Sequence, residues 1–234
     1  MQKIEEEAGV ALYKSINEVK KSKEFSMLVL DAVSDFFSIA FTHAYGEGKF
    51  QIGVEGGIFI EDLISRSLKS FLEAGLRDRL VKYVRRSEQL AKLTTLWEFS
   101  RTRKLKASMD IKITPDIIIS VMKNGCMTER VALEIKTEYS EQAKQKLTKA
   151  KEACLKSGID YYGVCIFARQ TYITEISKED GQTGKKWIYL VGGPYSWDQA
   201  RNTWVFRMVN DDLERLYIEI LDKIYNWIKP LYDK

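Results

Sequence analysis

Two apolar runs separated by an asparagine-glycine pair constrain the fold of this chain more than any other feature. Residues 113–122 and 127–136 are rich in β-branched side chains and flank a short polar segment centred on Asn124-Gly125. An Asn-Gly pair between apolar runs is the strongest short signal for a hairpin, because both residues accept the positive φ of a type I′ turn. The sequence therefore predicts two adjacent antiparallel strands.

A helix and a third strand are expected directly after this hairpin. Residues 139–157 carry apolar side chains at helical spacing and are followed by Gly158, which is typical of a helix end. The inner face of this helix is expected to carry Ala143, Leu147, Ala150 and Cys154. Residues 160–168 are a short apolar run typical of a buried strand. The order β-β-α-β predicts a mixed sheet whose last strand lies parallel to the strand before the helix, after a right-handed crossover.

The segment before the hairpin is expected to be mainly helical. Residues 58–74 place apolar side chains on one stripe, with a break at the glycines of residues 53–57 and a helix end at Gly75. An acid, Glu61, borders this stripe, and two other acids, Glu55 and Asp62, are near Glu61 in the sequence. An acid at the edge of a buried stripe is typically paired or functional.

The segment after the three-strand unit is expected to add strands and a helix. Residues 186–192 and 203–209 predict two strands joined by a long loop, and residues 211–230 predict an amphipathic helix that starts with a capping box. The economical description is a single α/β (α+β) domain, residues 1–234, with a mixed central sheet flanked by helices. Its parts are a helical N-terminal part at about 1–106, a core at about 58–168 and C-terminal strands and helix at 186–234.

Charged side chains at the edges of the hairpin strands indicate a functional site. Asp116 begins one strand, and Glu134 and Lys136 lie two residues apart on the other, so the strand period of two points both to the same face. Burying such charges is unfavourable unless they pair with each other or bind a metal.

Composition excludes several classes of protein. The chain has a single histidine, His43, so a zinc site with two histidines is excluded. Its three cysteines match no disulfide or zinc spacing, which favours free thiols in a cytoplasmic protein. We find neither an uninterrupted apolar span nor a secretion signal in the sequence and expect no membrane association.

Basic residues concentrate in the segment before the hairpin. Residues 77–106 contain ten Lys and Arg against three Asp and Glu, a surplus of seven that exceeds the net charge of +4 for the whole chain. Two interpretations stay open: a solvated helix face, or a surface that follows the phosphates of a nucleic acid.

Pro115-Asp116 and the later Glu134-x-Lys136, in this strand-turn-strand-helix setting, resemble the PD-(D/E)xK nuclease superfamily, the fold of most type II restriction endonucleases. The resemblance covers roughly residues 58–168. It implies a restriction endonuclease-like core with catalytic Asp116, Glu134, Lys136 and Glu61. It also implies Mg²⁺ bound by Asp116, Glu134, the Ile135 carbonyl and Glu61, with Glu55 and Asp62 as alternatives to Glu61.

The activity implied by this resemblance is Mg²⁺-dependent, sequence-specific cleavage of double-stranded DNA by a homodimer, without an organic cofactor. In that reaction Lys136 would orient the attacking water; burial favours a lowered pKa of its ammonium, and the nearby carboxylates oppose it. The side chains expected to contact DNA are Arg101, Arg103, Lys104, Arg169, Gln170, Arg201 and Asn202. Two alternatives stay open: a structure-specific nuclease, such as a junction resolvase or repair enzyme, and a DNA-binding module without catalysis.

Overall fold

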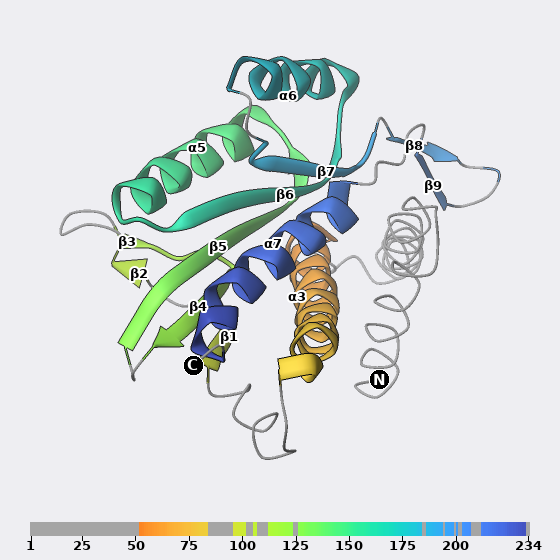
Figure 1. Ribbon diagram of the computed structural model, residues 1–234. Coiled ribbons are helices and arrows are strands. Elements are labelled where there is room, and N and C mark those ends of the chain that lie inside the picture. The colour runs from red at the N-terminus through yellow and green to blue at the C-terminus, as the bar shows by residue number, and fades with distance from the viewer. Residues whose placement is uncertain are drawn as a thin grey trace.

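The described part of the chain forms an α/β fold, a five-stranded mixed sheet with four flanking helices, as the sequence predicts (Figure 1). This computed structural model describes residues 52–83, 96–101, 105–106, 112–123, 126–183, 186–193, 195–198, 200, 203–206 and 212–232. His43 lies outside these residues, as do the predicted turn at Asn124-Gly125, the start of the C-terminal capping box and most of the expected N-terminal helices.

The sheet has the spatial order β1-β4-β5-β6-β7. Its strands are β1 (Trp97–Arg101), β4 (Ile117–Lys123), β5 (Cys126–Tyr139), β6 (Asp160–Ala168) and β7 (Ile188–Gly192). The helices are α3 (Ile52–Leu80), α5 (Glu141–Lys156), α6 (Gln170–Thr183) and α7 (Asp212–Ile228). Shorter elements are η1 (Val81–Tyr83), β2 (Leu105–Lys106), β3 (Lys112–Ile113), β8 (Tyr195–Asp198), β9 (Thr203–Phe206) and η2 (Lys229–Leu231).

The pairing of the central strands confirms the predicted β-β-α-β unit. Strands β4 and β5 are antiparallel, and their last pair is Lys123 with Cys126, so the hairpin closes at the predicted position. Strand β6 lies parallel to β5, and α5 connects the two. Helix α5 is capped at its start by the Ser140 side chain, which accepts a hydrogen bond from the Ala143 amide, and it is followed by Gly158 at a φ of 67°. The positive φ explains why glycine follows this helix.

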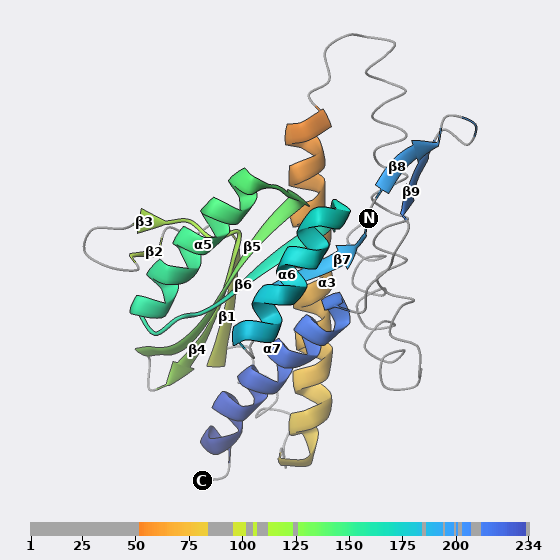
Figure 2. The same ribbon diagram turned by 90° about the horizontal axis from the view of Figure 1, so that it is seen from above.

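Two layers of helices cover the two faces of the sheet (Figures 1 and 2). Helices α3 and α7 pack on the face that carries Ile119, Leu133 and Val164. Helices α5 and α6 pack on the other face, which carries Ala132 and Cys165. Because neighbouring residues of a strand point to opposite faces, each central strand contributes to both cores.

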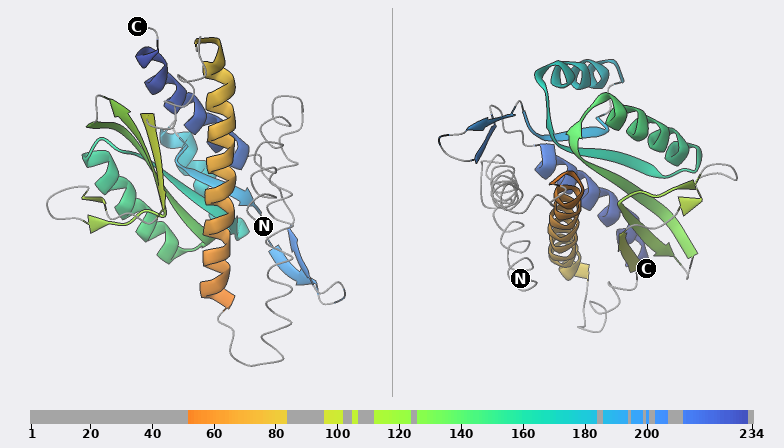
Figure 3. Two further views of the ribbon diagram at one scale, coloured as in Figure 1. Left: turned by 90° about the horizontal axis from the view of Figure 1, so that it is seen from below. Right: turned by 180° about the vertical axis from the view of Figure 1, so that it is seen from behind.

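Helices α3 and α7 lie side by side on their face of the sheet, as the views of Figure 3 show. The Tyr217 hydroxyl on α7 donates to the Ile64 carbonyl of α3 at 3.1 Å and lies 2.7 Å from the Ser67 hydroxyl. Arg79 near the end of α3 forms an ion pair of 2.5 Å with Asp222 of α7. These contacts hold α3 against α7.

The predicted limits of the helix at residues 58–74 are wrong at both ends. Helix α3 starts at Ile52, before the expected glycine break, and continues through Gly75 to Leu80. Leu76 and Leu80 are fully or almost fully buried and extend the apolar stripe by two more turns. This burial outweighs the intrinsic helix penalty of the glycines.

The elements not expected from the sequence include β1, α6 and β8. Strand β1 lies within the segment expected to be helical and pairs with the whole first part of β4, from Trp97 with Val121 to Arg101 with Ile117. Helix α6 follows β6 directly, where a loop is expected. Strand β8 lies in the expected loop between the last two strands, where it pairs with β9. The pairing partner of β1 lies far enough along the chain that local pattern does not reveal it.

We find no helix in the described ranges that combines the length and the apolar composition needed to cross a bilayer.

Candidate active site

The junction between the start of β4 and the middle of β5 brings the predicted acids together. Asp116 lies immediately before β4, and its Oδ2 accepts a hydrogen bond of 2.6 Å from the Ile135 amide of β5. The antiparallel pairing of Ile117 with Leu133 sets this position. The strand register therefore holds Asp116 beside the Glu134-Ile135-Lys136 segment.

The Lys136 ammonium contacts oxygens of all three partner residues at this junction. Its Nζ lies 2.6 Å from Glu134 Oε1, 3.0 Å from the Ile135 carbonyl oxygen and 4.0 Å from Asp116 Oδ2. Ile135 points the other way, into the core formed with α3 and α7. Glu134 and Lys136 thus share a face of the sheet, as the strand period predicts.

The three charged side chains are mostly withdrawn from solvent. Their exposed fractions are 17% for Asp116, 16% for Glu134 and 24% for Lys136. Water screens charges weakly at such depth, so the interactions between these groups are stronger than those of a surface ion pair. We call this cluster of Asp116, Glu134, the Ile135 carbonyl and Lys136 the carboxylate-lysine centre.

The surroundings of the centre favour protonation of its two carboxylates, Asp116 and Glu134. Burial raises the pKa of Asp116, and the Ile135 hydrogen bond and the Lys136 charge only partly oppose it. Burial and then the charge of Asp116 raise the pKa of Glu134. Two carboxylates share one ammonium here, so the centre carries an excess of negative charge.

The ammonium of Lys136 remains protonated at neutral pH. Burial alone lowers its pKa, but the charge of Glu134, the hydrogen bond to it, and the charges of Asp116 and Glu61 together raise it above its ordinary value. Of the two opposing effects expected from the sequence, the carboxylates are the stronger. In this arrangement Lys136 is a hydrogen-bond donor and not a base.

The acid on α3 approaches the centre from the layer that contains α7. Burial raises the pKa of Glu61, and the charge of Asp116 raises it further, which places this carboxylate within electrostatic range of the centre. Asp62, an alternative to Glu61, instead forms ion pairs with Arg66 at 2.7 Å and with Arg101. The side chain of Glu55 lies outside the described residues.

Three of the seven residues expected to bind DNA lie in the described part of the chain. Arg101 is on edge strand β1 and is paired with Asp62. Arg169 is largely exposed and lies 3.3 Å from Glu138, while Gln170 begins α6. The remaining ones, Arg103, Lys104, Arg201 and Asn202, lie outside the described residues.

Sequence reasoning missed two further side chains that interact electrostatically with Glu134. Lys146 on α5 lowers the pKa of Glu134 through its charge. The Tyr161 hydroxyl on β6 is buried without a hydrogen-bond partner, and burial followed by the charge of Glu134 raises its pKa. Both come from elements that follow β5 in the chain. The packing of α5 on the sheet brings Lys146 near Glu134, and the parallel pairing of β6 with β5 brings Tyr161 near it.

The buried cysteines do not offer an alternative nucleophile. Burial raises the pKa of Cys154 to about 12, and it raises the pKa of Cys165 to about 12 as well. A thiol that stays protonated is a poor nucleophile. Cys126 is exposed, and all three cysteines are free thiols, as predicted.

The donor atoms at the centre suit a magnesium ion, although they are few. Among the described residues we find no group of three or more His, Cys, Asp and Glu side chains placed to hold a metal. Magnesium needs only one or two carboxylates, because it keeps several of its waters. Asp116, Glu134 and the Ile135 carbonyl supply such oxygens, and the excess negative charge favours a divalent cation.

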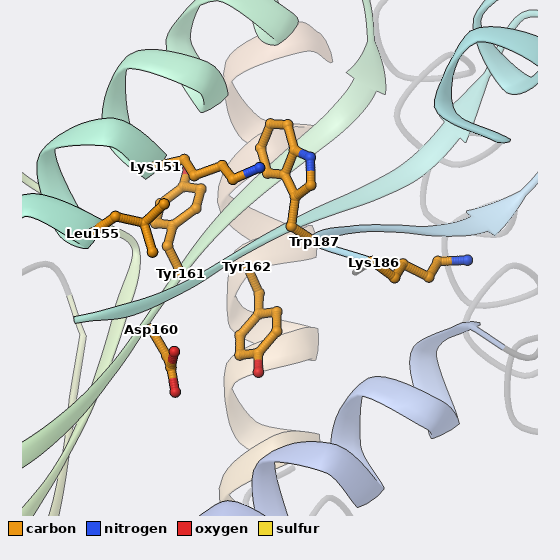
Figure 4. Close-up of a pocket in the computed structure, with 7 residues that line it drawn as sticks. All are labelled: Lys151, Leu155, Asp160, Tyr161, Tyr162, Lys186 and Trp187. Carbon is orange, nitrogen blue, oxygen red and sulfur yellow. The ribbon is translucent and has the colours of Figure 1, made fainter. Parts of the chain in front are cut away.

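A separate cavity of about 220 Å³ lies at the start of β6 (Figure 4). Its lining consists of Lys151, Leu155, Asp160, Tyr161, Tyr162, Lys186 and Trp187. Its charged groups already have partners: Asp160 pairs with Lys223 at 2.6 Å, and Lys186 pairs with Asp212 at 2.7 Å. The Lys151 ammonium lies 4.0 Å from the centroid of the Trp187 ring. The cavity therefore lacks an uncommitted charged group for chemistry.

These features define an α/β protein with a half-buried carboxylate-lysine centre at a strand junction. Comparison of the chain with protein-family models, with curated proteins and with solved structures finds no match.

Proposed function

We propose that this protein is a Mg²⁺-dependent endonuclease that cuts double-stranded DNA, with a centre of the PD-(D/E)xK type. The observation that supports it best is the contact of Lys136 with Glu134, beside Asp116, at the junction of β4 and β5. Two acids and a lysine on adjacent antiparallel strands, followed by a helix and a parallel strand, are what the resemblance implies. By the same resemblance we propose sequence-specific cleavage in the manner of type II restriction enzymes.

The residues that would bind Mg²⁺ are Asp116, Glu134 and the Ile135 carbonyl, with Glu61 as a more distant acid. When bound, Mg²⁺ lowers the pKa of a water molecule and neutralises charge on the phosphate. The protein contributes the position of these oxygens: the strand register and the Ile135 amide hold Asp116 beside Glu134. Preorganised charge of this kind supplies much of the rate enhancement of many enzymes.

Lys136 would act as a hydrogen-bond donor during hydrolysis. A water oxygen forms a bond to phosphorus while the bond from phosphorus to the leaving oxygen breaks, and negative charge develops on the phosphate oxygens. The raised pKa of Lys136 keeps its ammonium charged, so it can orient the water and stabilise this charge. Removal of a single preorganised donor typically slows an enzyme by about 10² to 10³-fold.

Cleavage of both strands needs two centres, so we propose a homodimer that acts on duplex DNA. The basic segment at residues 77–106 supports a phosphate-binding role. The seven DNA-contacting residues remain predictions. Two of them form ion pairs within the protein: Arg101 with Asp62, and Arg169 with Glu138.

A gel assay tests the proposal. Long double-stranded DNA is incubated with the protein and Mg²⁺ at low salt, beside an EDTA control. We expect discrete bands that require Mg²⁺, and a loss of about 10²-fold or more in rate for Lys136→Ala. Lys223→Ala is the matched control, because Lys223 forms an ion pair of the same length, 2.6 Å, at a similar exposed fraction, 25% against 24%.

Each result of this assay has a defined meaning. A Lys136→Ala protein that cuts as fast as the parent would contradict the proposed role of the centre. Cleavage restricted to branched DNA would replace the proposal with a structure-specific nuclease. Salt-sensitive DNA binding without cleavage in any divalent metal would instead favour a binding module.

A further inference from the structure

We propose that Lys136 occupies the cation position of its own centre, so that a divalent metal binds only by displacing the ammonium. This inference rests on the proposed function for the identity of the metal ligands, but not for the contacts of Lys136. The ammonium already contacts Glu134 Oε1 at 2.6 Å and the Ile135 carbonyl at 3.0 Å. These oxygens belong to two of the three residues that the centre offers to a metal.

The geometry leaves no room for both cations on the same oxygens. Magnesium binds oxygen at about 2.0–2.1 Å, and ammonium binds it at hydrogen-bond distance. On the third residue, Asp116, Oδ2 lies 4.0 Å from the ammonium and accepts a hydrogen bond from the Ile135 amide. A divalent ion held by Asp116 and Glu134 would therefore lie against the Lys136 ammonium, and the repulsion between the two cations drives the ammonium away.

The side chain of Lys136 has a path by which to leave. It retains an exposed fraction of 24%, and its four-carbon stem allows several rotamers. Once displaced, the ammonium is no longer bound to Glu134 and the Ile135 carbonyl, and its hydrogens become available to water or phosphate. Lys136 thus occupies the cation position before metal binds, and its ammonium can contact water or phosphate after metal binds.

In this arrangement, metal binding and the release of the Lys136 ammonium from Glu134 occur together. Without metal, the centre is stabilised internally and Lys136 is held by its neighbours. With metal, the freed ammonium lies next to the proposed reaction site. A competing internal cation also weakens metal binding, because the metal must replace existing contacts.

The test measures Mn²⁺ affinity by titration calorimetry on the full chain without DNA. Lys136→Met removes the charge while keeping a flexible stem, and we expect it to bind Mn²⁺ about tenfold or more tightly than the parent. Lys146→Met is the matched control for long-range charge, since Lys146 acts on Glu134 electrostatically, without a hydrogen bond to it. We expect that control to change the affinity much less.

The outcomes separate this inference from the proposed function. An equal gain in affinity for Lys136→Met and Lys146→Met would show a general field effect and overturn displacement. Weaker or absent Mn²⁺ binding by a folded Lys136→Met protein, checked by circular dichroism, would overturn it as well. Tighter Mn²⁺ binding by Lys136→Met supports the inference even if the parent fails to cut DNA. If the parent cuts DNA but Lys136→Met shows no gain in affinity, the proposed function stands and the displacement of Lys136 is overturned.

Discussion

A carboxylate held by two tyrosines attaches the C-terminal helix to the sheet. Glu219 of α7 accepts a hydrogen bond of 2.5 Å on Oε1 from the Tyr162 hydroxyl and another of 2.5 Å on Oε2 from the Tyr189 hydroxyl. The two tyrosines come from neighbouring strands β6 and β7, and their exposed fractions are 1% and 2%. Glu219→Ala would therefore leave two phenol hydroxyls without their acceptor.

The loss of stability follows from the two hydrogen bonds that the variant loses. An unsatisfied buried polar group costs about 1–3 kcal/mol, so two hydroxyls give a range of about 2–6 kcal/mol. Glu219 is only partly buried, so water can reach part of the vacated space and reduce the loss. We expect Glu219→Ala to lower the free energy of unfolding by about 2–4 kcal/mol.

Urea unfolding followed by circular dichroism measures this loss in two backgrounds. In the Tyr162→Phe/Tyr189→Phe background the hydroxyls are absent, and Glu219→Ala should cost less than about 1 kcal/mol. The same loss in both backgrounds would refute the reasoning, because the effect of Glu219 would then not depend on the two hydroxyls.

The remaining predictions concern the centre and a helix end. Asp116 has a raised pKa, so the folded protein binds more protons than the unfolded chain, and its stability falls as pH rises above the ordinary aspartate value of 3.8. Asp116→Asn removes this effect, so without divalent metal the melting temperature of the variant minus that of the parent should rise as pH increases above 3.8, until Asp116 is ionised in the folded protein; a constant difference would contradict the assigned cause. Gly158 has a φ of 67°, so Gly158→Ala should destabilise the protein by about 1 kcal/mol in thermal unfolding, and Gly158→Asn by less. Equal stability of the parent and both Gly158 variants would show that the variants do not keep the positive φ at residue 158.

The central part of the fold is predictable because its signals are local. The hairpin follows from two apolar runs around a short turn, and the parallel strand β6 follows from a single intervening helix. The edge strand β1 is different, because its pairing partner β4 begins sixteen residues after Arg101. With few apolar residues of its own, β1 is stabilised by that partner and not by local pattern.

The candidate site is likewise predictable from the sequence only where its contacts follow from strand geometry. Glu134 and Lys136 share a face because strand geometry dictates it, and the register places Asp116 beside them. The relation of Glu61 to these groups depends on how α3 packs across the sheet, and that of Tyr161 on the pairing of β6 with β5. Such relations are tertiary, and the sequence indicates only that an acid lies at the edge of a buried stripe.

Strand β5 has a consequence for how this protein can change during evolution. Ile135 packs into the core with α3 and α7, while Glu134 and Lys136 face the other way. Inserting or deleting one residue just before this segment would turn both charged side chains into an apolar core and expel the isoleucine from it. Variation of the centre is therefore restricted to substitutions, and changes in chain length are confined to the connections between the strands.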